Sequence, residues 1–267
     1  MPRSPHRPRR PLRTAGAGAA VLLALSGCSA SGPSASGATG DGPSGTVTVF
    51  AAASLEESFT TLGERFEKAH PGTEVAFSFG GSDTLAAGIV GGAPADVFAA
   101  ASSSTMELVT DRGRTAGGPA TFARNRPEIA TLPGNPHGID SLEDLAAPGL
   151  KVVLCDRTVP CGAAARTALA AAGVDLTPAS YEQDVKSALT KVELKEADAA
   201  VVYRTDVRAA GDKVEGVEFP EAAEAVNDCP IALLEDAPNP TAAKEFVALV
   251  KSPEGRRVLA AAGFLEP

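Results

Sequence analysis

Two serines lie where a short apolar stretch gives way to a helical pattern, and their type and position suit the binding of a small anion. Ser54 follows Val47-Thr-Val-Phe-Ala-Ala-Ala, and Ser82 follows Phe77-Ser-Phe-Gly-Gly. A helix start presents unpaired backbone N–H groups and a partial positive charge. A serine hydroxyl at the same point adds a donor. Two such starts facing each other would bind an anion without lysine or arginine.

Ser54 also has a purely local interpretation. Ser54-Leu-Glu-Glu57 fits a capping box, in which the serine hydroxyl accepts a hydrogen bond from an amide of its own helix. The chain repeats this pattern at Ser104-x-x-Glu107 and Ser141-x-x-Asp144. Both the capping role and the anion-binding role therefore stay open for Ser54.

Three further candidate donors follow later in the chain. Pro160 is typical of a first helical turn, and it leaves the amide of Cys161 unpaired. Asp184 is a plausible helix cap that leaves the amide of Val185 free. Tyr203 ends a buried apolar run, at the sheet edge where open α/β sheets bind ligands. A packed tyrosine with a solvated hydroxyl is the alternative for Tyr203.

Strand and helix patterns alternate along the chain. Strands are expected over 47–50, 75–79, 95–100, 129–132, 151–154, 199–203 and 231–234. Helices are expected from 55 to the His70-Pro71-Gly72 stop and over 84–90, 104–112, 161–172, 184–194, 241–250 and 254–262. This alternation favours doubly wound, mainly parallel sheets with helices on both faces.

The N-terminal stretch has the order of a secretory signal. Residues 1–14 hold five arginines and no acid, and a short apolar segment follows. Leu25-Ser-Gly-Cys28 resembles a bacterial lipobox, which implies cleavage before Cys28 and lipid on its sulfur. Residues 1–27 are thus expected to be removed, and 28–45 to form a flexible tether at the outer face of the cell membrane. A plain signal peptide and twin-arginine export at Arg9-Arg10 are the alternatives.

Beyond the tether, the chain is expected to form two lobes. The stretches 117–127 and 220–230 are irregular and polar, so the chain is expected to cross between lobes there. Lobe one would hold 46–124 and 231–267, and lobe two 127–228. Two α/β lobes with two crossings describe the type II periplasmic-binding-protein fold of an importer's solute-binding protein.

The overall charge limits the partners. The full chain carries a net charge of −9. Without the five arginines of residues 1–27, 19 Lys and Arg remain against 33 Asp and Glu, a net charge of −14. This excludes nucleic acid as an expected partner. It also means that local dipoles must overcome the field of the whole protein for an anion to bind.

Cysteine and histidine usage argues against metal and enzyme chemistry. Cys155 and Cys161 are close enough in sequence to bridge, although three cysteines beyond Cys28 leave the connectivity open. The three histidines show no ligand spacing relative to the cysteines, so no zinc site is expected. Neither Ser54 nor Cys161 has an identifiable histidine base, and Gly-x-Ser-x-Gly is absent, so no enzyme is expected.

Several segments, taken in order, resemble the periplasmic molybdate-binding proteins of molybdate ABC importers. These segments are Val49-Phe-Ala-Ala-Ala-Ser54-Leu, Gly81-Ser82-Asp-Thr-Leu-Ala86, Gly92-Ala-Pro-Ala-Asp96-Val-Phe98, Val159-Pro-Cys-Gly162, Asp184-Val185 and Glu196-Ala-Asp-Ala-Ala-Val-Val-Tyr203. The likeness runs from about Val47 to the C-terminus.

The resemblance implies a ligand set and a partner. Two serines, two backbone amides and one tyrosine hold a tetrahedral oxyanion in that family, which points to Ser54, Ser82, Cys161, Val185 and Tyr203 here. Molybdate or tungstate would be the ligand, bound through its oxygens by a monomer with no cofactor. A membrane permease would be the partner. Sulfate or an iron–anion complex is the alternative ligand, although the scarcity of tyrosine and histidine counts against iron.

Two positions depart from the family pattern. Asp83 follows Ser82 where a small neutral residue is more usual, and an inward carboxylate would oppose anion binding. Cys161 replaces a small residue such as alanine, but its backbone amide would still donate, and a bridge to Cys155 would stiffen the loop. Asp96 is expected to hold its own loop.

Overall fold

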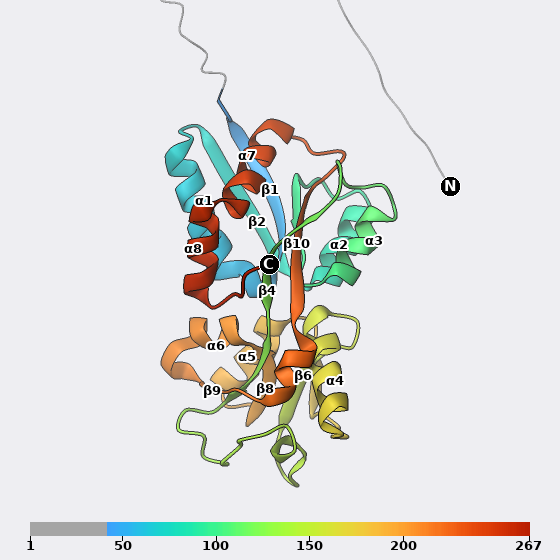
Figure 1. Ribbon diagram of the computed structural model, residues 1–267, viewed down its shortest axis with the longest axis vertical. Helices are drawn as coiled ribbons and strands as arrows, with labels where there is room; N and C mark the ends of the chain where they lie inside the picture. Colours follow the sequence, from blue (N-terminus) through green and yellow to red (C-terminus); the bar gives the residue numbers. More distant parts are fainter. Residues whose placement is uncertain (1–41) are drawn as a thin grey trace, which may run out of the picture. The chain divides into compact units, whose positions relative to one another are not determined.

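Two five-stranded sheets, each flanked by helices, make up the computed structural model, which describes residues 42–267 (Figure 1). The predicted signal, Cys28 and most of the predicted tether lie outside the described residues. Within 42–267, no helix combines the length and the apolar character needed to cross a bilayer.

The first sheet has the order β2-β1-β3-β10-β4, and we call it and its helices the first lobe. Its strands are β1 (Gly45–Ala52), β2 (Thr73–Gly80), β3 (Val97–Ala99), β4 (Ala120–Asn125) and β10 (Asn227–Leu233). Its helices are α1 (Glu56–Ala69), α2 (Ser82–Val90), α3 (Ser103–Thr110), α7 (Pro240–Lys251) and α8 (Pro253–Ala262), with the short 3-10 turn η1 (Ala53–Leu55) before α1.

The second sheet has the order β7-β6-β8-β5-β9 and defines the second lobe. Its strands are β5 (Pro127–Thr131), β6 (Val152–Cys155), β7 (Ser180–Glu182), β8 (Ala199–Tyr203) and β9 (Glu215–Val217). Its helices are α4 (Pro160–Ala172), α5 (Val185–Glu193) and α6 (Arg204–Ala210), with the 3-10 turns η2 (Asp144–Ala146), η3 (Gly211–Lys213) and η4 (Pro220–Ala225).

Each sheet is mixed, because one strand runs against the other four. In the first sheet β10 is antiparallel to both neighbours, β3 and β4. In the second sheet β5 is antiparallel to β8 and β9. The sheets are therefore mainly parallel, as predicted, but not purely so. The reversed strands β5 and β10 both lie next to the places where the chain passes between sheets.

The two crossings are more regular than the sequence indicated. The stretches 117–127 and 220–230 were expected to be irregular, which is wrong for much of both. Strand β4 fills 120–125, η4 fills 220–225, and β10 begins at Asn227. Asn227 pairs in register with Asn125, so the two crossing strands are hydrogen-bonded to each other where they leave the first sheet. Figure 1 shows both running toward the second sheet.

Apolar side chains bury both faces of the first sheet. Val47, Val49 and Ala51 of β1 point into a core shared with α1, α7 and α8. Phe98 and Ala100 belong to a smaller core on the other face, under α2 and α3. Successive strand residues point to opposite faces of a sheet. Val97 and Ala99 of β3 therefore belong to the first core, while Phe98 between them belongs to the second.

One core fills the second lobe, and it also includes one residue of the first lobe. Its members come from β5, β6, β8, α4 and α5, and Ala53 of η1 packs among them. The turn that carries Ser54 therefore already lies against the second lobe.

Local signals explain where the helices near this contact begin and end. Pro160 is the first residue of α4, and Gly173 ends the helix in the left-handed region at φ 69°. Asp184 caps α5 by accepting a hydrogen bond from the Ser187 amide at 2.8 Å. The expected cap Ser104 is wrong, because α3 starts one residue earlier and Ser102 accepts from the Thr105 amide.

Candidate anion-binding site

Ser54 lies in η1 with a hydroxyl that has no protein partner. The residue is 4% exposed, and its Oγ forms no hydrogen bond within the described residues. Helix α1 starts at Glu56 with Leu55 at its cap position and no side-chain cap. The capping box that Ser54-Leu-Glu-Glu57 favoured is therefore not formed. A buried hydroxyl without a partner costs free energy, and this makes Ser54 a candidate donor to something bound.

Ser82 is the first residue of α2, at the end of the loop that follows β2. It is 1% exposed, and its Oγ accepts a hydrogen bond from the Ala101 amide at 3.1 Å. A hydroxyl has one proton to give, and this bond does not use it. Ser82 is thus fixed in place and still able to donate.

Asp83 directly follows Ser82 in the chain. Its Oδ1 is buried without a hydrogen-bond partner. A side chain at Gly81 would lie 2.8 Å from that oxygen and 2.6 Å from the backbone oxygen of Gln183. Asp83 Oδ1 therefore lies by the contact between the lobes, just before α5. Glycine is required at 81 because the two lobes approach closely there.

The start of α4 is tied to the preceding strand. Cys155 at the end of β6 forms a disulfide with Cys161, while Cys229 is free and buried. The first backbone bond of α4 runs from the Ala163 amide to Val159, so the Cys161 amide precedes it. A side chain at Gly162 would lie 1.9 Å from the carbonyl oxygen of Asp156. The loop and the helix start are therefore packed backbone against backbone.

The start of α5 faces the first lobe. Its first backbone bond joins the Ala188 amide to Asp184, so the Val185 amide precedes it. A cavity of about 440 Å³ runs between Ala53, Phe79 and Gly80 of the first lobe and the 182–191 segment of the second. The turn that carries Ser54, the end of β2 before Ser82 and the start of α5 therefore meet at one seam, and none of the five predicted ligand residues itself lines this cavity.

Tyr203 ends β8 and is 1% exposed. Its hydroxyl accepts a hydrogen bond from Asn227 Nδ2 at 2.6 Å. Burial, with smaller effects of Cys229 and Asp206, raises the pKa of Tyr203 well above its ordinary value. Tyr203 therefore keeps its proton and can donate it.

Three charged side chains connect the lobes beside this seam. Lys186 of α5 contacts Glu57 of α1 at 2.5 Å and Asp206 of α6 at 3.5 Å. Asp206 is fully buried, and burial raises its pKa to about 6 even though Lys186 lowers it. Burial opposes the charge on Lys186, but Asp206 and Glu57 outweigh it and raise the pKa of Lys186.

The sequence patterns did not indicate Asn227, Lys186 or Asp206. Asn227 lies in a stretch expected to be irregular, and Lys186 is an ordinary charged residue of a helix. Asp206 follows Tyr203 at the spacing of a capping box, and its carboxylate does accept from the Tyr203 amide at 3.1 Å. That spacing was the only available signal. Asp96 holds its loop as expected, since it accepts from the amides of Thr48 and Asn239.

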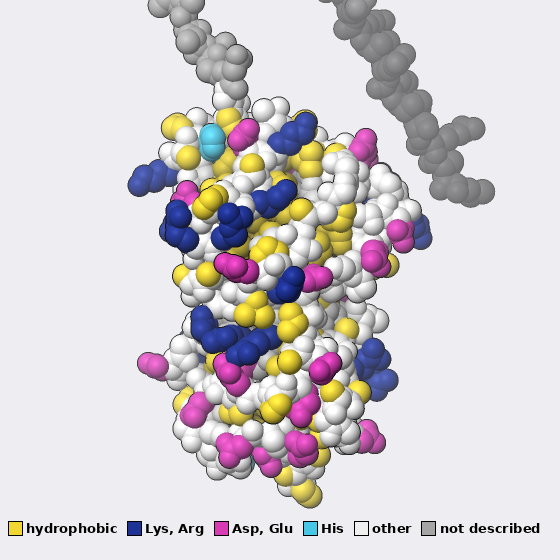
Figure 2. Space-filling view, in the orientation of Figure 1, with side chains coloured by type: hydrophobic (Ala, Val, Ile, Leu, Met, Phe, Trp, Pro, Cys, Tyr) yellow, Lys and Arg dark blue, Asp and Glu magenta, His cyan; other side chains and the backbone are white. Residues whose placement is uncertain are grey.

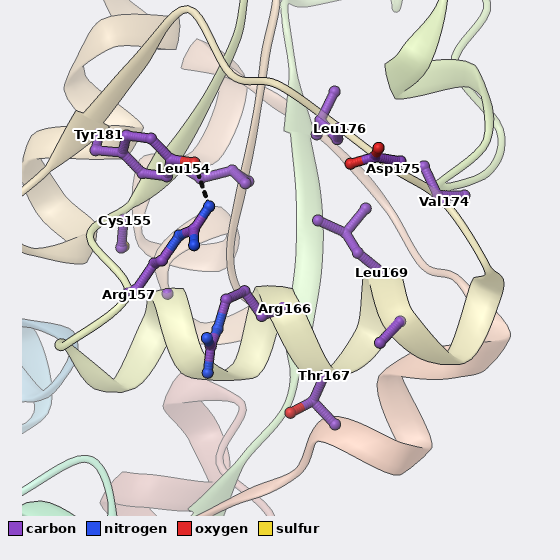
Figure 3. A pocket seen from close by; sticks show the side chains of 12 residues that line it. Leu154, Cys155, Arg157, Arg166, Thr167, Leu169, Val174, Asp175, Leu176 and Tyr181 are labelled. Atoms are coloured by element: carbon purple, nitrogen blue, oxygen red, sulfur yellow. Dashed lines mark hydrogen bonds between the residues drawn. The ribbon is translucent and has the colours of Figure 1, made fainter.

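A second cavity, of about 470 Å³, lies behind α4 in the second lobe (Figure 3). Arg157, Arg166 and Asp175 line it beside an apolar wall, and Arg157 reaches the Tyr181 hydroxyl at 3.5 Å. None of the five predicted ligand residues lines this cavity. Within 42–267 no group of three His, Cys, Asp or Glu side chains is placed to hold a metal ion.

Two sheet lobes with two crossings, and helix starts that meet where the lobes touch, define a two-lobed binding protein of the type II periplasmic fold. A family model described as bacterial extracellular solute-binding protein matches residues 47–265. The molybdate-binding protein ModA of Mycobacterium tuberculosis is 42% identical over 249 residues, which cover 93% of this chain and 95% of that protein. The chain belongs to the family of bacterial extracellular solute-binding proteins that includes ModA.

Two more relatives agree. ModA of Escherichia coli is 33% identical and covers 82% of this chain and 89% of its own length. The solved periplasmic molybdate-binding protein of Azotobacter vinelandii matches with a TM-score of 0.73 at 22% identity, over 83% of this chain and 99% of that one. At that identity the structural match shows the fold. The resemblance to molybdate-binding proteins drawn from the sequence is confirmed, and these relatives are binding proteins rather than enzymes.

Proposed function

We propose that this protein captures molybdate between its two lobes and delivers it to the permease of an ABC importer. The observation that carries the proposal is a pair of buried hydroxyls, one in each lobe, that each accept a hydrogen bond from the protein and keep their own proton free to donate. Ser82 accepts from the Ala101 amide and Tyr203 accepts from Asn227. Each has a proton left to give, as a fully deprotonated oxyanion requires. The names of the relatives support molybdate as that oxyanion.

The proposed ligand set has five neutral donors. They are the hydroxyls of Ser54, Ser82 and Tyr203 and the amides of Cys161 and Val185. Hydrogen bonds to a charged group contribute about 1.5–3 kcal/mol each. Five supply roughly 7–15 kcal/mol before the cost of removing water from a dianion. Micromolar to nanomolar affinity is the expected result.

Tungstate has the same charge and shape, so we propose that it binds as well. Sulfate has the same charge but is smaller, and its rejection would depend on how rigidly the two lobes hold the donors. The closed contact at Gly81 and the disulfide at the start of α4 support a rigid arrangement.

Titration calorimetry tests the function. The soluble domain, from residue 42, is titrated with molybdate, tungstate, sulfate and phosphate. Heat is expected with the first two, and a flat trace with molybdate refutes the proposal. A stronger response to sulfate than to molybdate would identify sulfate as the ligand and would leave the proposed oxyanion site unchanged. Ser82→Ala is expected to weaken molybdate binding at least tenfold, and unchanged affinity would remove Ser82 from the ligand set.

We also propose that the mature protein is a monomer outside the cytoplasm, anchored to the cell membrane by lipid on Cys28. The lipobox-like sequence supports the lipid anchor, and the description of the family as extracellular supports a location outside the cytoplasm. Cys28→Ala is expected to release the protein from the membrane fraction. Retention of the variant in that fraction would contradict the anchor.

A further inference from the structure

Asn227 is a half-buried residue whose side chain contacts the buried Tyr203 and which is not itself among the proposed ligand residues. It opens β10, and its Nδ2 lies 2.6 Å from the Tyr203 hydroxyl oxygen and 3.4 Å from the carbonyl oxygen of Pro160. Tyr203 and Pro160 belong to β8 and α4, two of the three second-lobe elements that supply proposed ligand donors. One side chain therefore connects the end of β8 with the start of α4.

The contact with Pro160 determines the orientation of the Asn227 side-chain amide. A backbone carbonyl can only accept, so the group that faces it must be the NH₂ and not the oxygen. The same NH₂ then gives its second proton to Tyr203. The tyrosine oxygen is thus an acceptor toward Asn227, and its own proton is directed elsewhere.

We propose that Asn227 is a positioning residue for anion binding, which engages the acceptor lone pair of Tyr203 so that its hydroxyl can only donate to the ligand. This inference rests on the proposed function. A tyrosine without this partner could turn its proton toward the Pro160 carbonyl and present a lone pair to the anion, which would repel it.

Asn227 lies on one of the two strands that cross between the lobes, so its contact with Tyr203 is also part of the connection about which the lobes would move. Asn227 pairs with Asn125 on the other crossing strand. Asn125 donates to Thr205 Oγ1 at 2.9 Å, two residues after Tyr203. Both crossing strands therefore hold the corner that carries Tyr203. A movement of the lobes about these strands would move the tyrosine with the second lobe and keep its donor direction.

A double-mutant cycle tests the inference with molybdate calorimetry on four proteins: wild type, Asn227→Leu, Tyr203→Phe and the double variant. Asn227→Leu is expected to weaken binding about tenfold or more in the wild-type background, the effect of one hydrogen bond to a charged group. In the Tyr203→Phe background, with no hydroxyl to orient, the same substitution is expected to change affinity less than about twofold.

The outcomes separate the two proposals. An equal loss in both backgrounds would mean that Asn227 only supports the hinge, and no loss in the wild-type background would also overturn its positioning role. A wild-type protein that binds no oxyanion would overturn the proposed function and this inference with it. Asn227→Asp, which keeps the shape, guards against misfolding of the leucine variant. Its carboxylate would accept a hydrogen bond from the tyrosine hydroxyl and so turn that donor away from the ligand; binding is therefore expected to fall further, and unchanged affinity contradicts the inference.

Discussion

The unpartnered hydroxyl of Ser54 predicts that one substitution will move stability and affinity in opposite directions. Ser54→Ala removes a polar atom that is buried in a 4% exposed residue and makes no hydrogen bond within 42–267. Burying such a group costs about 1–3 kcal/mol. The ligand-free variant is therefore expected to be more stable than wild type, by about 1 kcal/mol or more where the lobes stay closed. Molybdate affinity is expected to fall about tenfold or more, because one hydrogen bond to a charged group is lost.

Ser58 provides a matched control four residues away. It is also 4% exposed, but its hydroxyl donates to the Leu55 carbonyl at 3.0 Å. Ser58→Ala is expected to lower the free energy of unfolding by about 1 kcal/mol and to leave molybdate affinity unchanged. The comparison thus separates a satisfied hydroxyl from an unsatisfied one at equal burial.

Urea denaturation and calorimetry measure the two effects of Ser54→Ala. Unfolding is followed without ligand, and molybdate is titrated under the same conditions. The reasoning fails if Ser54→Ala destabilises the ligand-free protein as Ser58→Ala does, since Ser54 would then have a partner of its own. It also fails if affinity is unchanged, because the hydroxyl would then not face the ligand.

Three other changes have expected outcomes. Asp83→Asn is expected to tighten molybdate binding several-fold at low salt, because the substitution removes a carboxylate beside the proposed site; weaker binding in calorimetry would mean that Asp83 organises the loop. Because burial raises the pKa of Asp206 to about 6, the folded state holds this proton more tightly than the unfolded state. Stability is thus gained as pH falls through 6 and lost as it rises; Asp206→Asn is expected to remove about 1 kcal/mol of the wild-type gain between pH 7 and pH 5 in urea unfolding. An unchanged pH dependence in that variant would contradict the assignment. Replacing Cys155 and Cys161 together by serine is expected to weaken binding roughly threefold or more, since the start of α4 loses a restraint, and equal affinity would show that packing alone holds the loop.

The parts of the fold with strong local signals could be predicted from the sequence. The apolar run 199–203 is strand β8 with those bounds, and Pro160 and Gly173 bracket α4. Strand β4 was missed because its residues Ala-Thr-Phe-Ala-Arg-Asn mix buried and exposed positions without clean alternation. Among consecutive serines, the pattern selected Ser104 as the cap of α3, but only the backbone direction decides which hydroxyl reaches an amide.

The residues of the candidate site also fall into those that the sequence could indicate and those that it could not. Residues at strand ends and helix starts were predictable because topology alone brings such positions to one edge. Asn227 was not predictable, because its role depends on a contact with Tyr203, 24 residues away, and on the carbonyl of Pro160. A long-range hydrogen bond from a crossing strand leaves no periodicity in the sequence.

The hydrogen-bond partners of the proposed donors also provide a reason for ligand selection in an acidic protein. Ser82 and Tyr203 each accept one hydrogen bond from the protein, so both keep a proton to donate to the proposed ligand. A ligand that carries its own O–H, such as hydrogen phosphate, needs an acceptor, and the two backbone amides and the hydroxyls of Ser82 and Tyr203 are all directed to donate; among the proposed groups only the Ser54 oxygen accepts nothing from the protein. A fully deprotonated dianion satisfies every donor. None of these donors is charged. The proposed site therefore needs no patch of positive side chains on a protein whose net charge is negative. In the proposed site the scarcity of acceptors therefore disfavours a ligand that carries protons, and size selection is left to the closeness of the two lobes.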